Sequence, residues 1–133
     1  MTPLNPRRIG KAVTVIERIG VTQRWSDIVI HQGTAYFVEV ANDSIQDVRS
    51  QITQVLAQIE DRLKRVESDK TRLLQVLIYL ADLADVAALN EQWDAWVPPG
   101  HAPARACVRV ELAPGYRVEM VVTAAVDGNR RTE

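Results

Sequence analysis

The first forty residues alternate short apolar runs with turn residues, which is typical of β-strands. Val13–Ile16 is rich in β-branched residues, so we expect a first strand there. Between Ser26 and Val40, two apolar runs flank Gln32-Gly33-Thr34. A turn signal between two such runs predicts a β-hairpin.

A helical period replaces this pattern after residue 41. Apolar residues recur at spacings of three and four from Ile45 to Val66, which predicts an amphipathic helix of about five turns. Residues 42–44 are capping types, and Asp47 follows Ser44 by three positions, as in a capping box. We therefore expect the helix to begin at Ser44.

The next segment, Leu73–Leu80, is almost continuously apolar. Periodicity alone does not separate a buried strand from a buried helix in such a run. We favour a strand, because two amphipathic helices need a sheet to cover. Asp85 is the expected cap of the second helix, whose apolar face carries Val86, Leu89, Trp93 and Trp96. The two tryptophans are interpreted as core residues.

The end of the chain alternates apolar and polar residues over 105–112 and again over 117–124, with a turn at residues 113–116. This predicts two strands joined as a hairpin. The order is β-β-β-α-β-α-β-β, an α+β fold with a mixed sheet and two helices on one face. The uncovered face would carry Cys107, Val121 and Ala125, and a half-apolar face predicts a homo-oligomer.

Composition narrows the function classes. The 133 residues suit one domain, 1–133, with a core at about residues 10–126. A net charge of −1 and no basic stripe interleaved with aromatic residues argue against nucleic acid as a partner, and hence against an endoribonuclease. One cysteine, no signal peptide and no apolar run of about 20 residues predict a cytoplasmic protein without a membrane partner.

Arg105 is the strongest candidate for a functional residue. It follows a proline-rich loop, residues 98–103, and opens a strand that we expect to face away from the helices. Ala104 and Ala106 leave room around it, and a guanidinium is a rigid fork that matches a carboxylate. An interface salt bridge explains the same facts equally well. The chain has no glycine-rich phosphate loop and no metal-binding pair of CxxC or HxxxH type.

Longer motifs carry a family resemblance. Pro103–Val108 (PARACV), followed by Val118-Glu119-Met120, resembles the signature of the RidA/YjgF family. Asp47–Val66 is similar to the long helix of that family. Tyr79–Asp82, with Asp85 and Asn90 after it, is similar to the family's fourth strand and the start of its second helix. The resemblance covers Ser26 to Ala125.

The resemblance implies a chorismate-mutase-like fold and a homotrimer with small-molecule sites in clefts between subunits. It implies hydrolysis of reactive enamines and imines to 2-oxo acids and ammonia, without metal or organic cofactor. Arg105 would hold the substrate carboxylate, and Asn90 would line the pocket. The backbone of Cys107 and the side chain of Glu119 would position water and the imine nitrogen.

Two departures from the family pattern concern the substrate. Residues 21–26 lack the family's tyrosine, and Glu39 on the third strand stands where the family offers backbone. Glu39 could pair with Arg105 and compete with an acidic substrate, or it could activate water. The first case would favour a non-catalytic binding or regulatory trimer, and the second an enzyme.

The positions of Arg105 and Glu119 lead to a geometric prediction. By alternation they would share one sheet face, and if Leu112 pairs with Val118 they would lie about 20 Å apart within one chain. If both serve one site, they would then come from different chains; otherwise Glu119 is structural.

Overall fold

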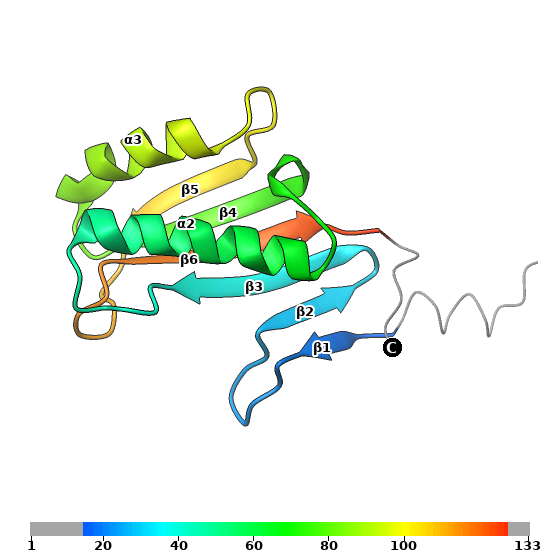
Figure 1. Cartoon of the computed structure of the whole chain (residues 1–133). Helices are drawn as coiled ribbons and strands as arrows, with labels where there is room; N and C mark the ends of the chain where they lie inside the picture. The colour runs from blue at the N-terminus through cyan, green and yellow to red at the C-terminus, as the bar shows by residue number, and fades with distance from the viewer. Residues whose placement is uncertain (1–14, 128–133) are drawn as a thin grey trace, which may run out of the picture.

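Within residues 15–127, six strands form one mixed sheet, and two α-helices cover the same face of it (Figure 1). The structure is a computed structural model that describes residues 15–127. The strands are β1 (Glu17–Ile19), β2 (Ile28–His31), β3 (Thr34–Val40), β4 (Leu73–Leu80), β5 (Ala104–Arg109) and β6 (Val118–Ala125). The helices are α2 (Val48–Arg65) and α3 (Val86–Trp96). One short 3₁₀ turn, Lys70–Arg72, lies between α2 and β4, and a second, Leu83–Asp85, directly precedes α3.

The order of strands across the sheet is β1-β2-β3-β6-β4-β5. The β4–β5 pair is parallel, and every other neighbouring pair is antiparallel. The sequence therefore predicts the α+β class and the order of elements correctly. The ambiguous run at residues 73–80 is a strand, and it lies between β6 and β5.

The hairpin of β2 and β3 is confirmed. Its two-residue loop, Gln32-Gly33, has positive φ at both positions, 52° and 76°. That backbone matches the right-handed twist of the flanking strands, and it suits a glycine at the second position. The pairing with β2 reaches only as far as Tyr36, whereas β3 pairs with β6 along its whole length.

Two predicted boundaries are wrong. The first strand is Glu17–Ile19. Its position is decided by pairing with β2, of Glu17 with Ile30 and of Ile19 with Ile28, and not by local β propensity. Val15 and Ile16 precede that strand, and residues 13–14 lie outside the described part of the chain.

The long helix begins later than predicted. Asp47 is its N-cap, with extended backbone and a side chain that accepts a hydrogen bond from the amide of Ser50 at 2.9 Å. Ile45 is 93% exposed and precedes the helix. Asp43 accepts a hydrogen bond from the Ile45 amide at 3.1 Å, so the expected capping segment forms a turn.

The core lies between the sheet and the helices. Alternate residues of β6 and the apolar stripe of α2 are buried against each other: Val118, Met120, Val122, Ala124, Ile52, Val55, Leu56, Ile59 and Leu63. From α3, Leu89 and Trp93 complete this core. Neither helix of residues 15–127 combines the length and apolarity needed to cross a membrane.

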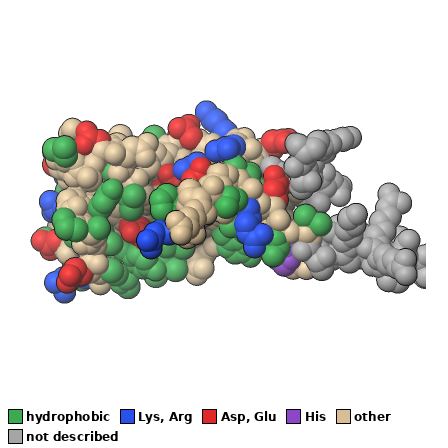
Figure 2. Space-filling view, turned by 90° about the horizontal axis from the view of Figure 1, so that it is seen from below, with side chains coloured by type: hydrophobic (Ala, Val, Ile, Leu, Met, Phe, Trp, Pro, Cys, Tyr) green, Lys and Arg blue, Asp and Glu red, His purple; other side chains and the backbone are tan. Residues whose placement is uncertain are grey.

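No helix of residues 15–127 lies over the opposite face of the sheet. Tyr36, Val38 and Val108 are 46%, 52% and 45% exposed on that face. Figure 2, seen from the β1 side, shows hydrophobic side chains gathered along the lower part of the molecule, away from the helices. The predicted half-apolar face is therefore present, and the expected Val121 and Ala125 lie on it, because they alternate with the buried residues of β6.

Candidate functional site

Arg105 lies on β5, at the edge of the sheet beside α3. The guanidinium nitrogen Nη2 donates a hydrogen bond to Oδ1 of Asn90 at 2.7 Å. The guanidinium carbon lies 5.2 Å from the centre of the Trp93 ring, within the range of a cation–π interaction. Arg105 itself is exposed. None of the six ion pairs among residues 15–127 includes it.

The expected orientation of Arg105 is wrong. β5 does not form a hairpin with β6; it lies parallel to β4, and Arg105 is opposite Val76, which is fully buried under the helices. Arg105 therefore faces the helices. The strand also ends at Arg109 and does not reach Leu112, so the expected pairing of Leu112 with Val118 does not occur.

Cys107 shares this face. It lies opposite Ile78 and packs against the core, so the expectation that it lies on the uncovered face is wrong. Its thiol is free, as expected for a chain with one cysteine. The backbone of Cys107, which the family resemblance singles out, lies on the outermost strand two residues from Arg105.

Glu119 lies on the other face. It pairs with Tyr79 of β4, which alternates with the buried Ile78 and Leu80. Val122 and Arg105 both lie opposite Val76, so Glu119 is three residues and two strands away from Arg105, a Cα separation of about 14 Å. Arg105 and Glu119 therefore lie on opposite faces of the sheet in one chain, and the prediction of a shared face is wrong.

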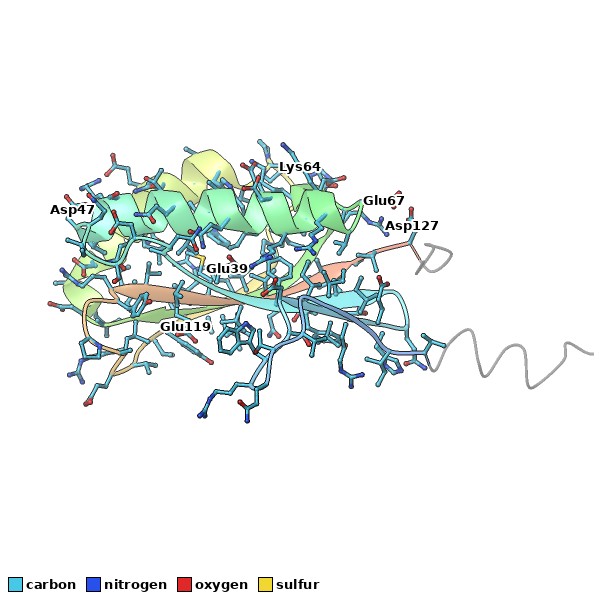
Figure 3. All side chains as sticks on the ribbon, turned by 60° about the horizontal axis from the view of Figure 1, so that its bottom comes forward. Glu39, Asp47, Lys64, Glu67, Glu119 and Asp127 are labelled. Atoms are coloured by element: carbon cyan, nitrogen blue, oxygen red, sulfur yellow. The ribbon has the colours of Figure 1, made fainter. Side chains whose placement is uncertain are left out.

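Glu39 is buried between β3 and α2, with 5% of its surface exposed. Figure 3 shows it on the helix side of the sheet, with Glu119 on the opposite side. Its carboxylate accepts hydrogen bonds from Nε of Arg62 at 3.1 Å and from Nε2 of Gln58 at 3.0 Å. Three strand spacings separate β3 from β5, so Glu39 and Arg105 lie about 16 Å apart within the chain.

This arrangement bears on the two alternatives for Glu39. Within one chain, Glu39 pairs with Arg62 and not with Arg105. Arg62 also lies 3.6 Å from Asp27 in the loop between β1 and β2. The carboxylate of Glu39 thus joins β3 to α2, and no carboxylate of residues 15–127 forms an ion pair with Arg105.

A hollow of about 720 Å³ lies beside β3. The loop between β1 and β2 contributes Trp25 and Asp27, and β6 contributes Glu119 and Val121. Trp25 is 61% exposed. Glu39 and Arg62 also line this hollow. Of the five residues expected in the site, it therefore contains Glu39 and Glu119, and Arg105 is not among its lining residues.

Sequence reasoning missed the contact between Trp93 and Arg105. The residue is buried, as expected, but one face of its ring also contacts the guanidinium of Arg105. The available signal was the spacing of Asn90 and Trp93, because residues three apart share one side of a helix. The sequence does not indicate that β5 pairs in parallel with β4, which is the pairing that brings Arg105 to that side of α3. Among residues 15–127, no three His, Cys, Asp or Glu side chains are grouped to hold a metal ion.

Comparison with known proteins agrees with the fold and the motif. A family model described as Endoribonuclease L-PSP matches residues 15–126. The RutC family protein YoaB of Escherichia coli is 45% identical over 112 residues, covering 84% of this chain and 98% of YoaB. A RutC family protein of Haemophilus ducreyi is 43% identical over 115 residues, covering 85% and 98%.

A solved structure shows the same fold. It is a member of the YjgF protein family from Neisseria meningitidis, with a TM-score of 0.81 and 39% identity, covering 86% of this chain and 98% of that one. The match extends from the residues before β1 to the end of β6, so it includes every element described above. This chain belongs to the RidA/YjgF family, which the Endoribonuclease L-PSP model describes.

Proposed function

We propose that this protein hydrolyses 2-imino acids and their enamine tautomers to 2-oxo acids and ammonia. The proposed site lies in a cleft between subunits of a homotrimer, and Arg105 binds the substrate carboxylate there. Family membership supports the reaction class. For this chain, the observation that carries the proposal is how the Arg105 guanidinium is held and which of its N–H donors stay available.

In the described part of the chain, that guanidinium is held by neutral partners only. Asn90 accepts one hydrogen bond from it, and Trp93 contacts its face. A guanidinium has five N–H donors, so most of them remain available. An exposed cation that is held in place without a counter-charge is suited to bind an anion, and its planar fork matches a carboxylate.

The chemistry is a hydrolysis of a C=N bond. Water adds to the imine carbon, and the resulting carbinolamine loses ammonia as its oxygen forms the C=O bond of the 2-oxo acid. Such a reaction needs a group that holds the substrate and a group that moves protons between water and nitrogen. Arg105 serves the first purpose. Glu119, a carboxylate in the hollow on the other sheet face, is proposed for the second.

Two chains are needed to combine these groups. Within one chain, Arg105 and Glu119 lie on opposite faces of the sheet, and Arg105 is outside the hollow. The uncovered apolar face around Val38 and Val108 provides a reason to associate, because burying it removes apolar surface from water. We propose that a neighbouring subunit covers this face and that β5 of one subunit approaches the hollow of the next.

The test is imine hydrolysis by the purified protein. An amino-acid oxidase generates 2-imino acids from acidic, aliphatic and aromatic amino acids, and semicarbazide competes for them. Wild type should increase 2-oxo acid formation. Arg105→Ala should lower kcat/KM roughly 10- to 100-fold, because it removes charge-assisted hydrogen bonds to the carboxylate. Arg105→Lys should fall between, since it keeps the charge but loses the fork.

The control is Arg65→Ala. Arg65 is also exposed and forms none of the ion pairs among the described residues, but it lies at the end of α2 and away from β5. Its replacement should leave hydrolysis unchanged. Equal activity of wild type and Arg105→Ala would refute the role of Arg105. Binding of 2-oxo acids without any acceleration would refute hydrolysis and favour a binding or regulatory trimer.

A further inference from the structure

Trp93 lies directly beneath the guanidinium of Arg105. Asn90 and Trp93 are three residues apart on α3 and so face the same side of the helix, toward β5. One residue accepts a hydrogen bond from the guanidinium edge at 2.7 Å, and the other contacts its face at 5.2 Å. The two contacts act on different parts of the group, so together they fix both its position and its plane.

The ring of Trp93 is itself packed into the core. Only 5% of Trp93 is exposed, and it belongs to the main hydrophobic core. Its ring centre lies 5.6 Å from that of Trp96, with the planes tilted by 40°. A ring that is packed on its other sides offers one rigid surface toward β5.

We propose that Trp93 is a positioning residue of the Arg105 site, which holds the guanidinium plane so that its free N–H donors point toward an incoming carboxylate. This inference rests on the proposed function of Arg105 as the carboxylate receptor. Trp93 acts through Arg105 and does not touch the substrate. Because the ring is neutral and uses the face of the guanidinium, it leaves the charge and the donors along the edge available.

The alternative partner for an exposed arginine would be a carboxylate. Arg49 and Arg117 illustrate that case, with ion pairs to Glu91 at 2.9 Å and to Asp85 at 2.8 Å. A carboxylate beside Arg105 would compete with the substrate for the same donors. An aromatic ring orders the long side chain in advance without this competition, and ordering in advance increases affinity.

The first experiment measures the dissociation constant for pyruvate by calorimetry. Trp93→Leu should raise it about 5- to 10-fold, the range expected for loss of one partly desolvated cation–π contact. Trp93→Phe keeps a smaller aromatic face and should restore most of the affinity. The control is Leu63→Ala, a truncation of the core under α2, which should lower stability but leave pyruvate binding unchanged. If Trp93→Phe binds as weakly as Trp93→Leu, the positioning role is refuted.

A double variant separates positioning from general damage. Trp93→Leu should cause no further loss of pyruvate affinity when Arg105 is already Ala, because the ring acts only through the guanidinium. An equal fold-loss in both backgrounds would show that Trp93 acts by another route and would overturn the inference.

A second measurement is independent of ligand and activity. In ¹⁵N NMR, the Nε–Hε group of Arg105 should be rigid in wild type and become mobile on the picosecond-to-nanosecond timescale in Trp93→Leu. If the wild-type protein neither binds pyruvate nor hydrolyses imines, the proposed function fails, and this measurement still decides the role of Trp93. A signal of equal mobility in both proteins would overturn the positioning role.

Discussion

Gln51 is expected to be the most important polar residue for stability. It is fully buried in α2, yet its amide reaches two separate loops. Nε2 lies 3.1 Å, 3.0 Å and 2.9 Å from the carbonyl oxygens of Ser44, Gln46 and Gly115. Oε1 accepts a hydrogen bond from the amide of Arg117 at 2.9 Å. One side chain thus connects the segment before α2 to the turn before β6.

The variant Gln51→Leu keeps a similar volume and removes all of these bonds. The two hydrogens on Nε2 serve three acceptors, so the side chain provides the equivalent of about three hydrogen bonds, each contributing about 1 kcal/mol net. The abandoned carbonyl and amide groups add a desolvation cost where water cannot reach them, and the leucine recovers part of it by apolar burial. We expect a loss of about 3 to 4 kcal/mol in the free energy of unfolding.

The assay is urea unfolding followed by tryptophan fluorescence at one fixed protein concentration, because association would shift the apparent stability. With a slope of about 2 kcal/mol per molar urea, the midpoint should fall by about 1.5 to 2 M. The matched control is Gln54→Leu, one turn further along α2, whose amide bonds to Asp43 and weakly to Ser50. Gln54→Leu should lower the free energy of unfolding by about 1 kcal/mol or less. Equal midpoints for the two variants would refute the reasoning.

Two further predictions concern single carboxylates. Glu39→Gln should preserve the rate of imine hydrolysis within about 2-fold. It should lower the free energy of unfolding by about 1 to 2 kcal/mol, because in one chain this carboxylate joins β3 to α2. A loss of activity in the same oxidase assay would instead assign Glu39 to catalysis. The pKa of Asp69 is lowered, chiefly by hydrogen bonds from the hydroxyl and the amide of Thr71. A carboxyl group with a depressed folded-state pKa contributes stability above its unfolded pKa and loses that contribution as pH falls through the folded value. Thr71→Val should therefore raise the pKa of Asp69 in an NMR titration, and an unchanged pKa would contradict this assignment.

Several features were predictable because they depend on neighbours in sequence. The 3.6-residue period identifies α2 and α3, and the positive φ values required at Gln32-Gly33 suit a two-residue turn. The family motif around Arg105 is also local. Boundaries were less predictable: Asp47 caps α2 in preference to Ser44, since the turn made by Asp43 occupies the residues before it.

The position of β5 could not be read from the sequence. Its alternation and its short connection to β6 favour a hairpin, but β4 lies between the two strands and pairs with both. Because β5 pairs with β4 and not with β6, Arg105 and Glu119 lie on opposite faces of the sheet and not on the same face. A strand has two edges and two faces, and alternation specifies only which residues share a face.

The sequence by itself determined the elements, their order and the family, and it singled out Arg105 as a candidate, because periodicity and motifs are properties of contiguous residues. The tertiary structure decided what each charged side chain meets. It placed Arg105 against Asn90 and Trp93, and Glu39 against Arg62. These contacts join segments 15 and 23 residues apart. They depend on strand pairing and on how each helix crosses the sheet, which the fold as a whole establishes.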